Sequence, residues 1–360
     1  MEALFAARGF DIIAPNTRSL REQVILVANV RQQGRAPGSE IGAEPSRRVA
    51  RDALWHTGVE VLRVLTYDRL MISRRLLSSV IFLAPALAQA QSGDPKFAAW
   101  LRALRADAAK AGVDAGTLDS ALGSVEQIPL VLEQARNQPE FKMTFERYLE
   151  IVVSPERVTR GKALLKENRV LVSRFAAPAG IPDSTLVALW GIESNYGARL
   201  GDFEVVAALA TLAYNNFRAK FFREQLIAAL KIVSQGHIGL HAMKGSWAGA
   251  MGQCQFIPTS FLAYAADGDG DGRKDIWTNK ADVFASIANY LRRVGWRPGL
   301  GWGSEVSSGT PAGAGERLVR PSGANGPSYR TTENFRVILR WNQSDFFGLA
   351  VGLLSDRIAT

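Results

Sequence analysis

The sequence predicts a mainly α-helical protein with at most a small β-sheet. Two observations favour this class. Apolar residues recur at three- and four-residue steps over long stretches of the chain, and no strand–helix–strand alternation of the βαβ kind is visible. The 360 residues are 47% hydrophobic and 21% charged, as in an ordinary globular protein with a sizeable core.

The first 70 residues carry no recognisable motif. Residues 31–52 are rich in Gly, Pro, Arg and Glu, a composition typical of poorly ordered chain. The character of the sequence changes at Met71, where a leader-like segment begins. We therefore interpret residues 1–70 as upstream sequence read in frame, with translation starting at Met71.

Residues 71–90 have the three parts of a secretory signal peptide. Arg74 and Arg75 form the positive start, a short apolar run follows, and an A-x-A site ends at Ala88. The run is too short to span a membrane; the alternative interpretation is an internal apolar helix. No cysteine stands directly after the run, so a lipid anchor lacks its attachment residue. We expect a soluble, monomeric mature protein in the periplasm.

Charge and cysteine content narrow the classes of partner and site. The net charge of +9 favours polyanionic partners such as nucleic acid, an acidic membrane surface or an acidic wall polymer. No block of Lys and Arg is interleaved with aromatic residues, so we expect no nucleic-acid partner. Cys254 is the only cysteine, which excludes an internal disulfide and a cysteine-based zinc cluster.

Most of the chain beyond the leader is predicted to be helical. Apolar residues at helical spacing predict helices over residues 97–180 and 207–236. Residues 299–329 shift to Gly, Ser, Pro and Thr, which predicts a long loop. An amphipathic segment, residues 335–358, follows and predicts a closing helix. Because that helix would complete the core, we place the loop inside a single domain, residues 91–360.

The segment 187–197 places an acid among apolar side chains. A helix that starts near Asp183 brings Trp190 and Glu193 onto one face, and Gly197 can end it. Burial disfavours the charged carboxylate, so an acid at this position tends to keep its proton and can act as a general acid. The alternative is a structural glutamate that is exposed or paired with a cation.

Three aspartates alternate with glycines in residues 267–272, which matches the start of an EF-hand loop. Thr278 stands where such a loop has its bidentate Glu, so the next acid, Asp282, would close an enlarged loop. The sequence predicts a structural Ca²⁺ ion; a solvated acidic turn is the alternative. The predicted metal ligands are Asp267, Asp269, Asp271, Arg273 through its carbonyl, and Asp282.

Residues 245–258 are dense in Gly and Ala and also contain Ser, Gln, Trp and Phe. Small residues let a backbone and a ligand approach closely, while the polar and aromatic side chains supply hydrogen bonds and stacking faces. This mixture suits a sugar-binding groove, although tight helix packing explains it equally well.

Taken together, these motifs resemble the lytic murein transglycosylase B family over residues 97–358. The segments that carry the resemblance are residues 190–197, 208–214, 245–252, the Asp-Gly loop, 286–291, and Asn342. The resemblance implies a lysozyme-like catalytic core embedded in helical subdomains, with Glu193 as the sole catalytic acid/base. It also implies a saccharide groove lined by Ser246, Gln255, Phe256, Tyr290 and Asn342. Trp341 and Phe346-Phe347 depart from the family, which has tyrosines there.

The activity implied by the resemblance is cleavage of the β-1,4 bond between N-acetylmuramic acid and N-acetylglucosamine in peptidoglycan, without water, leaving 1,6-anhydromuramic acid ends. No organic cofactor is expected, and association with murein synthases or amidases stays open. Two alternatives remain. A hydrolytic muramidase needs a second carboxylate, for which Asp202 and Glu204 are available. A calcium-stabilised murein-binding protein needs no catalysis at all.

Overall fold

The computed structural model describes residues 94–136, 143–307 and 309–360. The segments predicted as upstream sequence and signal peptide, residues 1–70 and 71–90, lie outside the described residues. Residues 94–360 belong to one of the two units into which the chain divides. No helix in the described part is long and apolar enough to cross a membrane.

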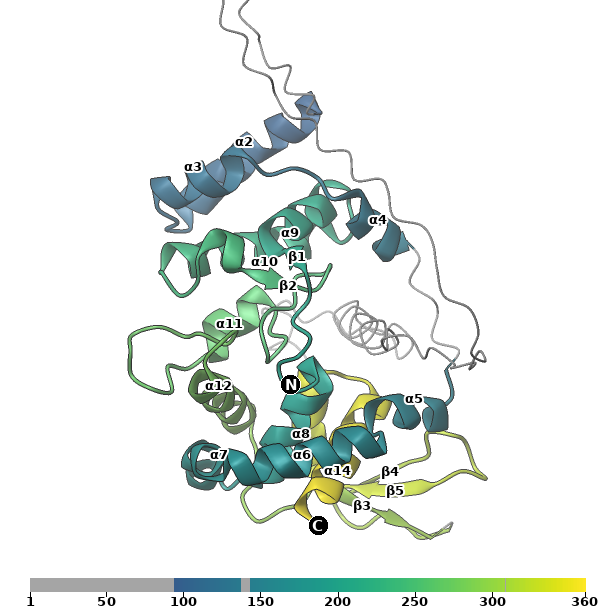
Figure 1. Ribbon diagram of the computed structural model, residues 1–360. Helices are drawn as coiled ribbons and strands as arrows, with labels where there is room; N and C mark the ends of the chain where they lie inside the picture. Colours follow the sequence, from purple (N-terminus) through teal and green to yellow (C-terminus); the bar gives the residue numbers. More distant parts are fainter. Residues whose placement is uncertain (1–93, 137–142, 308) are drawn as a thin grey trace, which may run out of the picture. The chain divides into compact units, whose positions relative to one another are not determined.

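The predicted class, mainly helical with a small sheet, is confirmed (Figure 1). The described helices are α2 (Pro95–Lys110), α3 (Ala115–Gly123), α4 (Pro129–Arg136), α5 (Phe145–Val152), α6 (Pro155–Glu167), α7 (Arg169–Ala176), α8 (Asp183–Ser194), α9 (Val205–Tyr214), α10 (Ala219–Ser234), α11 (Pro258–Tyr264), α12 (Lys280–Arg293), α13 (Glu333–Trp341) and α14 (Asp345–Ala359), with 3₁₀ turns η2 (Ala177–Ala179) and η3 (Leu240–Ala242).

Two small antiparallel sheets complete the described residues. One pairs β1 (Phe203–Glu204) with β2 (Lys244–Gly245). The other has the order β3-β5-β4, formed by β3 (Gly303–Val306), β4 (Arg317–Val319) and β5 (Ser328–Thr331). The stretch predicted as one long loop, residues 299–329, therefore contains β3, β4 and the start of β5, joined by loops. Strands of three or four residues are too short to show a clear alternating pattern.

Side-chain caps explain where several helices begin. Asp94, Asp114 and Ser154 each accept a hydrogen bond from a backbone amide in the first turn of α2, α3 and α6. Pro95 and Pro155 occupy first-turn positions, where the missing amide costs nothing. These caps satisfy donors that a helix leaves unpaired at its start.

Helix α8 is the centre of the core. Every residue from Ser184 to Ser194 is buried, and α6, α7, α12 and α14 all contact the helix (Figure 1). A helix that is apolar on all sides needs such a surrounding. Gly191 permits the closest packing, because a Cβ there would lie 2.6 Å from the ring of Tyr196.

The predicted closing helix, residues 335–358, is two helices. The chain leaves helical geometry at Asn342, which has φ −148° and ψ 119°, and α14 starts three residues later. The Asn342 Oδ1 accepts a hydrogen bond from the Ser344 amide at 3.2 Å, which stabilises the break. The amphipathic pattern continues across both helices and therefore hides the break.

Candidate active site

Glu193 lies in the last turn of α8 and is 1% exposed. The chain then turns sharply, because Asn195, Tyr196 and Gly197 all have left-handed backbone conformations, with φ of 51°, 58° and 78°. The Tyr196 hydroxyl donates to the backbone carbonyl of Arg157 at 2.8 Å. This contact fixes the turn that follows Glu193 against α6.

Tyr148 and Cys254 lie within electrostatic reach of Glu193. Burial raises the pKa of the Tyr148 hydroxyl, and the charge of Glu193 raises it further. Burial also raises the pKa of the Cys254 thiol, with smaller contributions from the charges of Glu193 and Asp282. The sequence placed Tyr148 only in a helical stripe, and a buried tyrosine at helical spacing gives no further signal of a functional role.

The segment predicted as a sugar groove forms a compact turn. The Ser246 amide donates to the Ala250 carbonyl at 2.8 Å, and the Ala250 amide donates to the Ser246 Oγ at 3.0 Å. Bridges from Met251 to Gly245 and to Phe256 hold both ends of the turn. A Cβ at Gly245 would lie 2.3 Å from the Ala250 carbonyl, so this approach requires glycine.

Two predicted groove residues carry buried polar atoms without a partner among the described residues. Gln255, at φ 47°, donates through Nε2 to the carbonyls of Leu200 and Gly252, while its Oε1 is unpaired. Asn342 uses Oδ1 to accept from Ser344, while its Nδ2 is unpaired. Buried polar groups are rarely left unsatisfied, so one acceptor and one donor are available to a ligand.

An aromatic cluster joins the other predicted groove residues. Ring centroids are 5.8 Å apart for Phe256 and Tyr290, 5.0 Å for Phe256 and Trp341, and 4.6 Å for Tyr290 and Trp341. The Tyr290 hydroxyl donates to the Arg340 carbonyl at 2.6 Å. Gln255 precedes Phe256 and Asn342 follows Trp341 in the sequence, so the backbone that carries each unpaired amide also carries a ring of the cluster.

The Asp-rich loop brings three of the five predicted metal ligands together. Carboxylate oxygens of Asp267, Asp269 and Asp282 lie within 4.8 Å of one another. The Asp271 carboxylate is not part of this cluster and accepts from the Arg273 amide at 2.7 Å. The role predicted for the Arg273 carbonyl stays a prediction. Asp282 thus lies beside Asp267 and Asp269 although it is four residues beyond the usual EF-hand place, and its role in closing the loop stays a prediction.

Asp282 is fully buried at the start of α12, and its two oxygens accept hydrogen bonds from the amides of Gly268 and Asp275. Burial raises the pKa of Asp282, and the nearby charges of Asp269 and Asp267 also act in that direction. A divalent cation would relieve this repulsion, and a cluster of carboxylate oxygens is the donor set that Ca²⁺ prefers.

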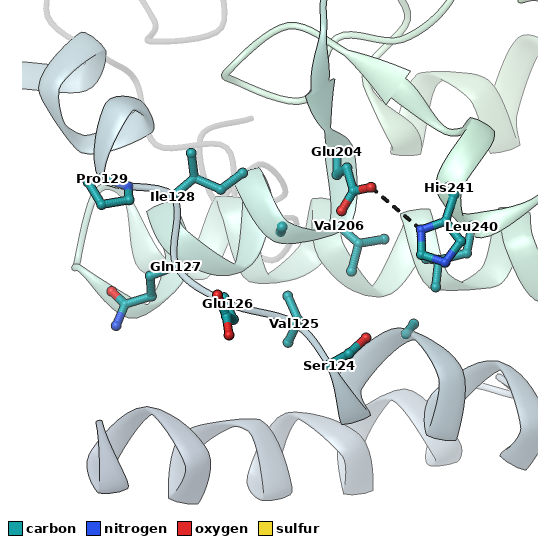
Figure 2. Close-up of a pocket in the computed structure, with 12 residues that line it drawn as sticks. Ser124, Val125, Glu126, Gln127, Ile128, Pro129, Glu204, Val206, Leu240 and His241 are labelled. Carbon is teal, nitrogen blue, oxygen red and sulfur yellow. Dashed lines mark ion pairs between the residues drawn. The ribbon is translucent and has the colours of Figure 1, made fainter. Parts of the chain in front are cut away.

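Glu204, one of the acids considered as a second catalytic carboxylate, lines a separate pocket of about 340 Å³ (Figure 2). Its carboxylate lies 3.2 Å from Lys244 Nζ and 3.5 Å from His241 Nδ1. Hydrogen bonding to Lys244 lowers the pKa of Glu204. The other wall of the pocket is the extended segment 124–129, on which Glu126 is labelled in Figure 2. Asp202 is exposed.

Sequence comparison identifies relatives of this chain. The family model described as "Transglycosylase SLT domain" matches residues 96–314 and 308–356. The membrane-bound lytic murein transglycosylase B of Escherichia coli (strain K12) is 28% identical over 288 residues, which cover 69% of this chain and 80% of that protein.

Solved structures share the fold. SltB3 from Pseudomonas aeruginosa, in complex with NAG-NAM-pentapeptide, matches with a TM-score of 0.70 and 39% identity, covering 73% of this chain and 79% of that one. SltB1 from the same organism matches with a TM-score of 0.67 and 27% identity, covering 74% and 98%. The lytic transglycosylase Slt35 of Escherichia coli, in complex with calcium, matches with a TM-score of 0.64 and 27% identity, covering 73% and 92%.

These matches confirm the predicted family and the lysozyme-like, mainly helical class. The family model covers most of the described residues and includes both Glu193 and Asn342. The chain therefore belongs to the transglycosylase SLT domain family, as a lytic transglycosylase of the murein transglycosylase B type that acts on peptidoglycan.

Proposed function

We propose that this enzyme cleaves the β-1,4 bond between N-acetylmuramic acid and N-acetylglucosamine and leaves 1,6-anhydromuramic acid ends, with Glu193 as its sole acid/base. One observation carries the proposal. Glu193 and Asp282 are the only buried carboxylates among the described residues, and both oxygens of Asp282 accept backbone amides of the Asp-rich loop. Among the described residues, no other buried carboxylate is therefore available as the second acid that a retaining glycosidase uses.

Glu193 acts first as the acid. Its burial at 1% exposure favours the neutral carboxyl group, which donates its proton to the glycosidic oxygen as the bond to C1 breaks. Tyr148 is held in its neutral form and is therefore a hydrogen-bond donor near the carboxylate that remains.

Glu193 then acts as the base. The substrate's own acetamido group stabilises the positive charge at C1, which replaces the missing second carboxylate. The Glu193 carboxylate takes the proton of the C6 hydroxyl, and the C6 oxygen attacks C1 and closes the 1,6-anhydro ring. The carboxyl group regains its proton and no water is consumed.

The proposed saccharide groove combines the unpaired amide atoms with the aromatic cluster. The Gln255 Oε1 accepts from a sugar hydroxyl or amide, and the Asn342 Nδ2 donates to a sugar oxygen. Phe256, Tyr290 and Trp341 are each 3% exposed and pack on one another, so in this proposal they form the apolar support of the groove. We assign to Asn342 and Ser246 the orientation of the acetamido and C6 groups.

We also propose that the Asp-rich loop binds a structural Ca²⁺ ion through Asp267, Asp269 and Asp282. The clustered carboxylate oxygens and the raised pKa of Asp282 support this assignment, and one relative, Slt35, is described in complex with calcium. When bound, the ion supplies positive charge that holds the loop against the start of α12. It takes no part in the chemical step.

Cellular location is the remaining part of the proposal. We infer a periplasmic enzyme whose mature form begins near residue 89 or 91, after the signal peptide predicted for residues 71–90. The basic composition of the chain suits a wall polymer that carries acidic peptide stems. N-terminal sequencing of the native protein tests this, since retention of residues 1–70 contradicts it.

The reaction type is tested by weighing the muropeptides released from purified sacculi. Anhydro products are lighter by one water than the reducing-end products of a muramidase. Reducing-end products alone support the hydrolytic alternative, and an absence of products supports a binding protein.

A further inference from the structure

Gln253 is a buried residue whose side-chain amide lies against helix α8 before Glu193 and against the turn that follows Glu193. Its Oε1 accepts a hydrogen bond from the indole Nε1 of Trp190 at 2.7 Å, one turn before Glu193. The same oxygen lies against the backbone of Gly197, where an added Cβ would be only 2.4 Å away. Gln253 itself is 7% exposed and Trp190 is 1% exposed, so solvent cannot replace this bond.

The other half of the Gln253 amide binds the Asp-rich loop. Its Nε2 donates to the Trp277 carbonyl at 2.8 Å, and its backbone amide donates to the Ile276 carbonyl at 2.8 Å. Trp277 is held in turn by Asp275, whose Oδ1 accepts its backbone amide at 2.9 Å, and the Asp275 amide donates to Asp282. A single side chain therefore joins α8 to the loop that ends at Asp282.

We propose that Gln253 is a positioning residue for Glu193, which holds the last turn of α8 at a fixed distance from residues 275–277. The inference rests on the proposed catalytic role of Glu193. Displacement of a reacting group by about 1 Å can lower a rate by about 100-fold, so a two-sided anchor beside the catalytic turn has a large effect on turnover.

The amide chemistry of Gln253 explains why this residue type is needed. One planar group supplies an acceptor to Trp190 and a donor to Trp277. A Gln253→Glu variant keeps the acceptor but turns an oxygen toward the Trp277 carbonyl. A Gln253→Met variant keeps the approximate volume and loses both bonds.

The test compares Gln253→Met with Gln225→Met. Gln225 is also buried, at 2% exposure, and its Oε1 accepts from the amide and the hydroxyl of Thr259, joining α10 to α11. Both variants should lower the Tm. Only Gln253→Met should lower kcat, by about 10- to 100-fold with KM unchanged, and shift the pH dependence of kcat, because only it moves Glu193.

A second variant keeps the inference testable if Gln253→Met does not fold. Trp190→Phe removes the donor of the same bond and keeps an aromatic ring, so it should reproduce the loss of kcat and the shifted pH profile. The double variant should lose no more kcat than Gln253→Met alone, because Gln253→Met already removes the bond to Trp190.

Two results have separate meanings. If Gln253→Met and Trp190→Phe match Gln225→Met in kcat and pH dependence while Glu193→Gln is inactive, the positioning role of Gln253 is wrong. If Glu193→Gln keeps its activity, the proposed role of Glu193 is wrong, and the positioning role of Gln253 is then wrong as well.

Discussion

The hydroxyl of Tyr196 donates a hydrogen bond to the backbone carbonyl of Arg157 at 2.8 Å, and this bond joins the turn after Glu193 to helix α6. Tyr196 is 4% exposed and has a left-handed backbone conformation. Its ring packs against Gly191 one turn before the end of α8. The conformation of the turn therefore depends on one buried side chain.

We predict that Tyr196→Phe lowers the free energy of unfolding by about 1–2 kcal/mol, because it removes the donor to a buried carbonyl and adds no compensating contact. Urea denaturation measures the loss. Tyr214→Phe is the matched control, since the Tyr214 hydroxyl donates to Asp94 at an exposed site and its loss should cost less. Equal losses for the two variants would contradict the structural role of Tyr196.

A second prediction concerns the unpaired Nδ2 of Asn342. Asn342→Asp removes that donor and keeps the oxygen that accepts from Ser344, so it should lower kcat/KM by about 10- to 100-fold with a moderate loss of Tm. Steady-state kinetics and thermal melts measure both quantities.

Asn334→Asp is the control for that variant. It places the same carboxylate at a fully buried position, but it also removes donors to the Arg297 and Leu300 carbonyls. It should lower the Tm much more than Asn342→Asp does. If the two variants destabilise the protein equally, the Nδ2 of Asn342 has a structural partner and is not reserved for substrate.

A third prediction concerns pH, calcium and Asp282. The pKa of Asp282 is raised in the folded protein above its ordinary value of 3.8, so the folded state holds the proton more tightly than the unfolded chain. Without metal, the contribution of this group to stability is therefore present at low pH and is lost as the pH rises from 3.8 through the raised pKa.

Thermal melts of the wild type and Asp282→Asn measure that effect. In a chelator, the Tm difference between the two should change with pH over this window in favour of the variant. At neutral pH, Ca²⁺ at 100 times its Kd should stabilise the wild type by about 2.7 kcal/mol and leave Asp282→Asn unaffected. Asp271→Asn, which alters a carboxylate outside the cluster, should still respond to Ca²⁺. A wild-type Tm that calcium does not change would contradict the metal site.

The fourth prediction separates the two reaction types. Glu204→Gln should leave the rate and the anhydro products unchanged within about twofold, because the Glu204 carboxylate is paired with Lys244 and His241 in a separate pocket. Only a small change in stability is expected for a half-exposed ion pair. A loss of activity comparable to that of Glu193→Gln would identify Glu204 as the second carboxylate of a muramidase.

The sequence alone predicts the site where a residue type is unusual for its surroundings. Glu193 interrupts an apolar helical stripe, and the alternation of Asp and Gly in residues 267–272 has few structural explanations. Asp282 could be named as the closing acid because it is the first carboxylate after Thr278, the usual position of the closing Glu. In the structure it lies beside Asp267 and Asp269.

Other features could not be predicted because their pattern matches that of ordinary core. Tyr148 lies at helical spacing, and only its position near Glu193 distinguishes it. The break at Asn342 is hidden because apolar residues continue through both α13 and α14. Gln253 is one polar residue in a Gly-rich turn, and its side-chain amide bonds to Trp190 and Trp277, which are 63 and 24 residues away in the sequence. Such distant partners leave no local sequence pattern.

The most direct test of the account is digestion of purified murein sacculi by the wild type and by Glu193→Gln, followed by mass measurement of the muropeptides. Glutamine keeps the size and polarity of the side chain at this buried position but can neither donate nor accept the catalytic proton. We predict anhydromuropeptides from the wild type and none from Glu193→Gln, with similar Tm values for the two proteins. Anhydromuropeptides from the variant at a comparable rate would contradict the assignment of Glu193 as the acid/base.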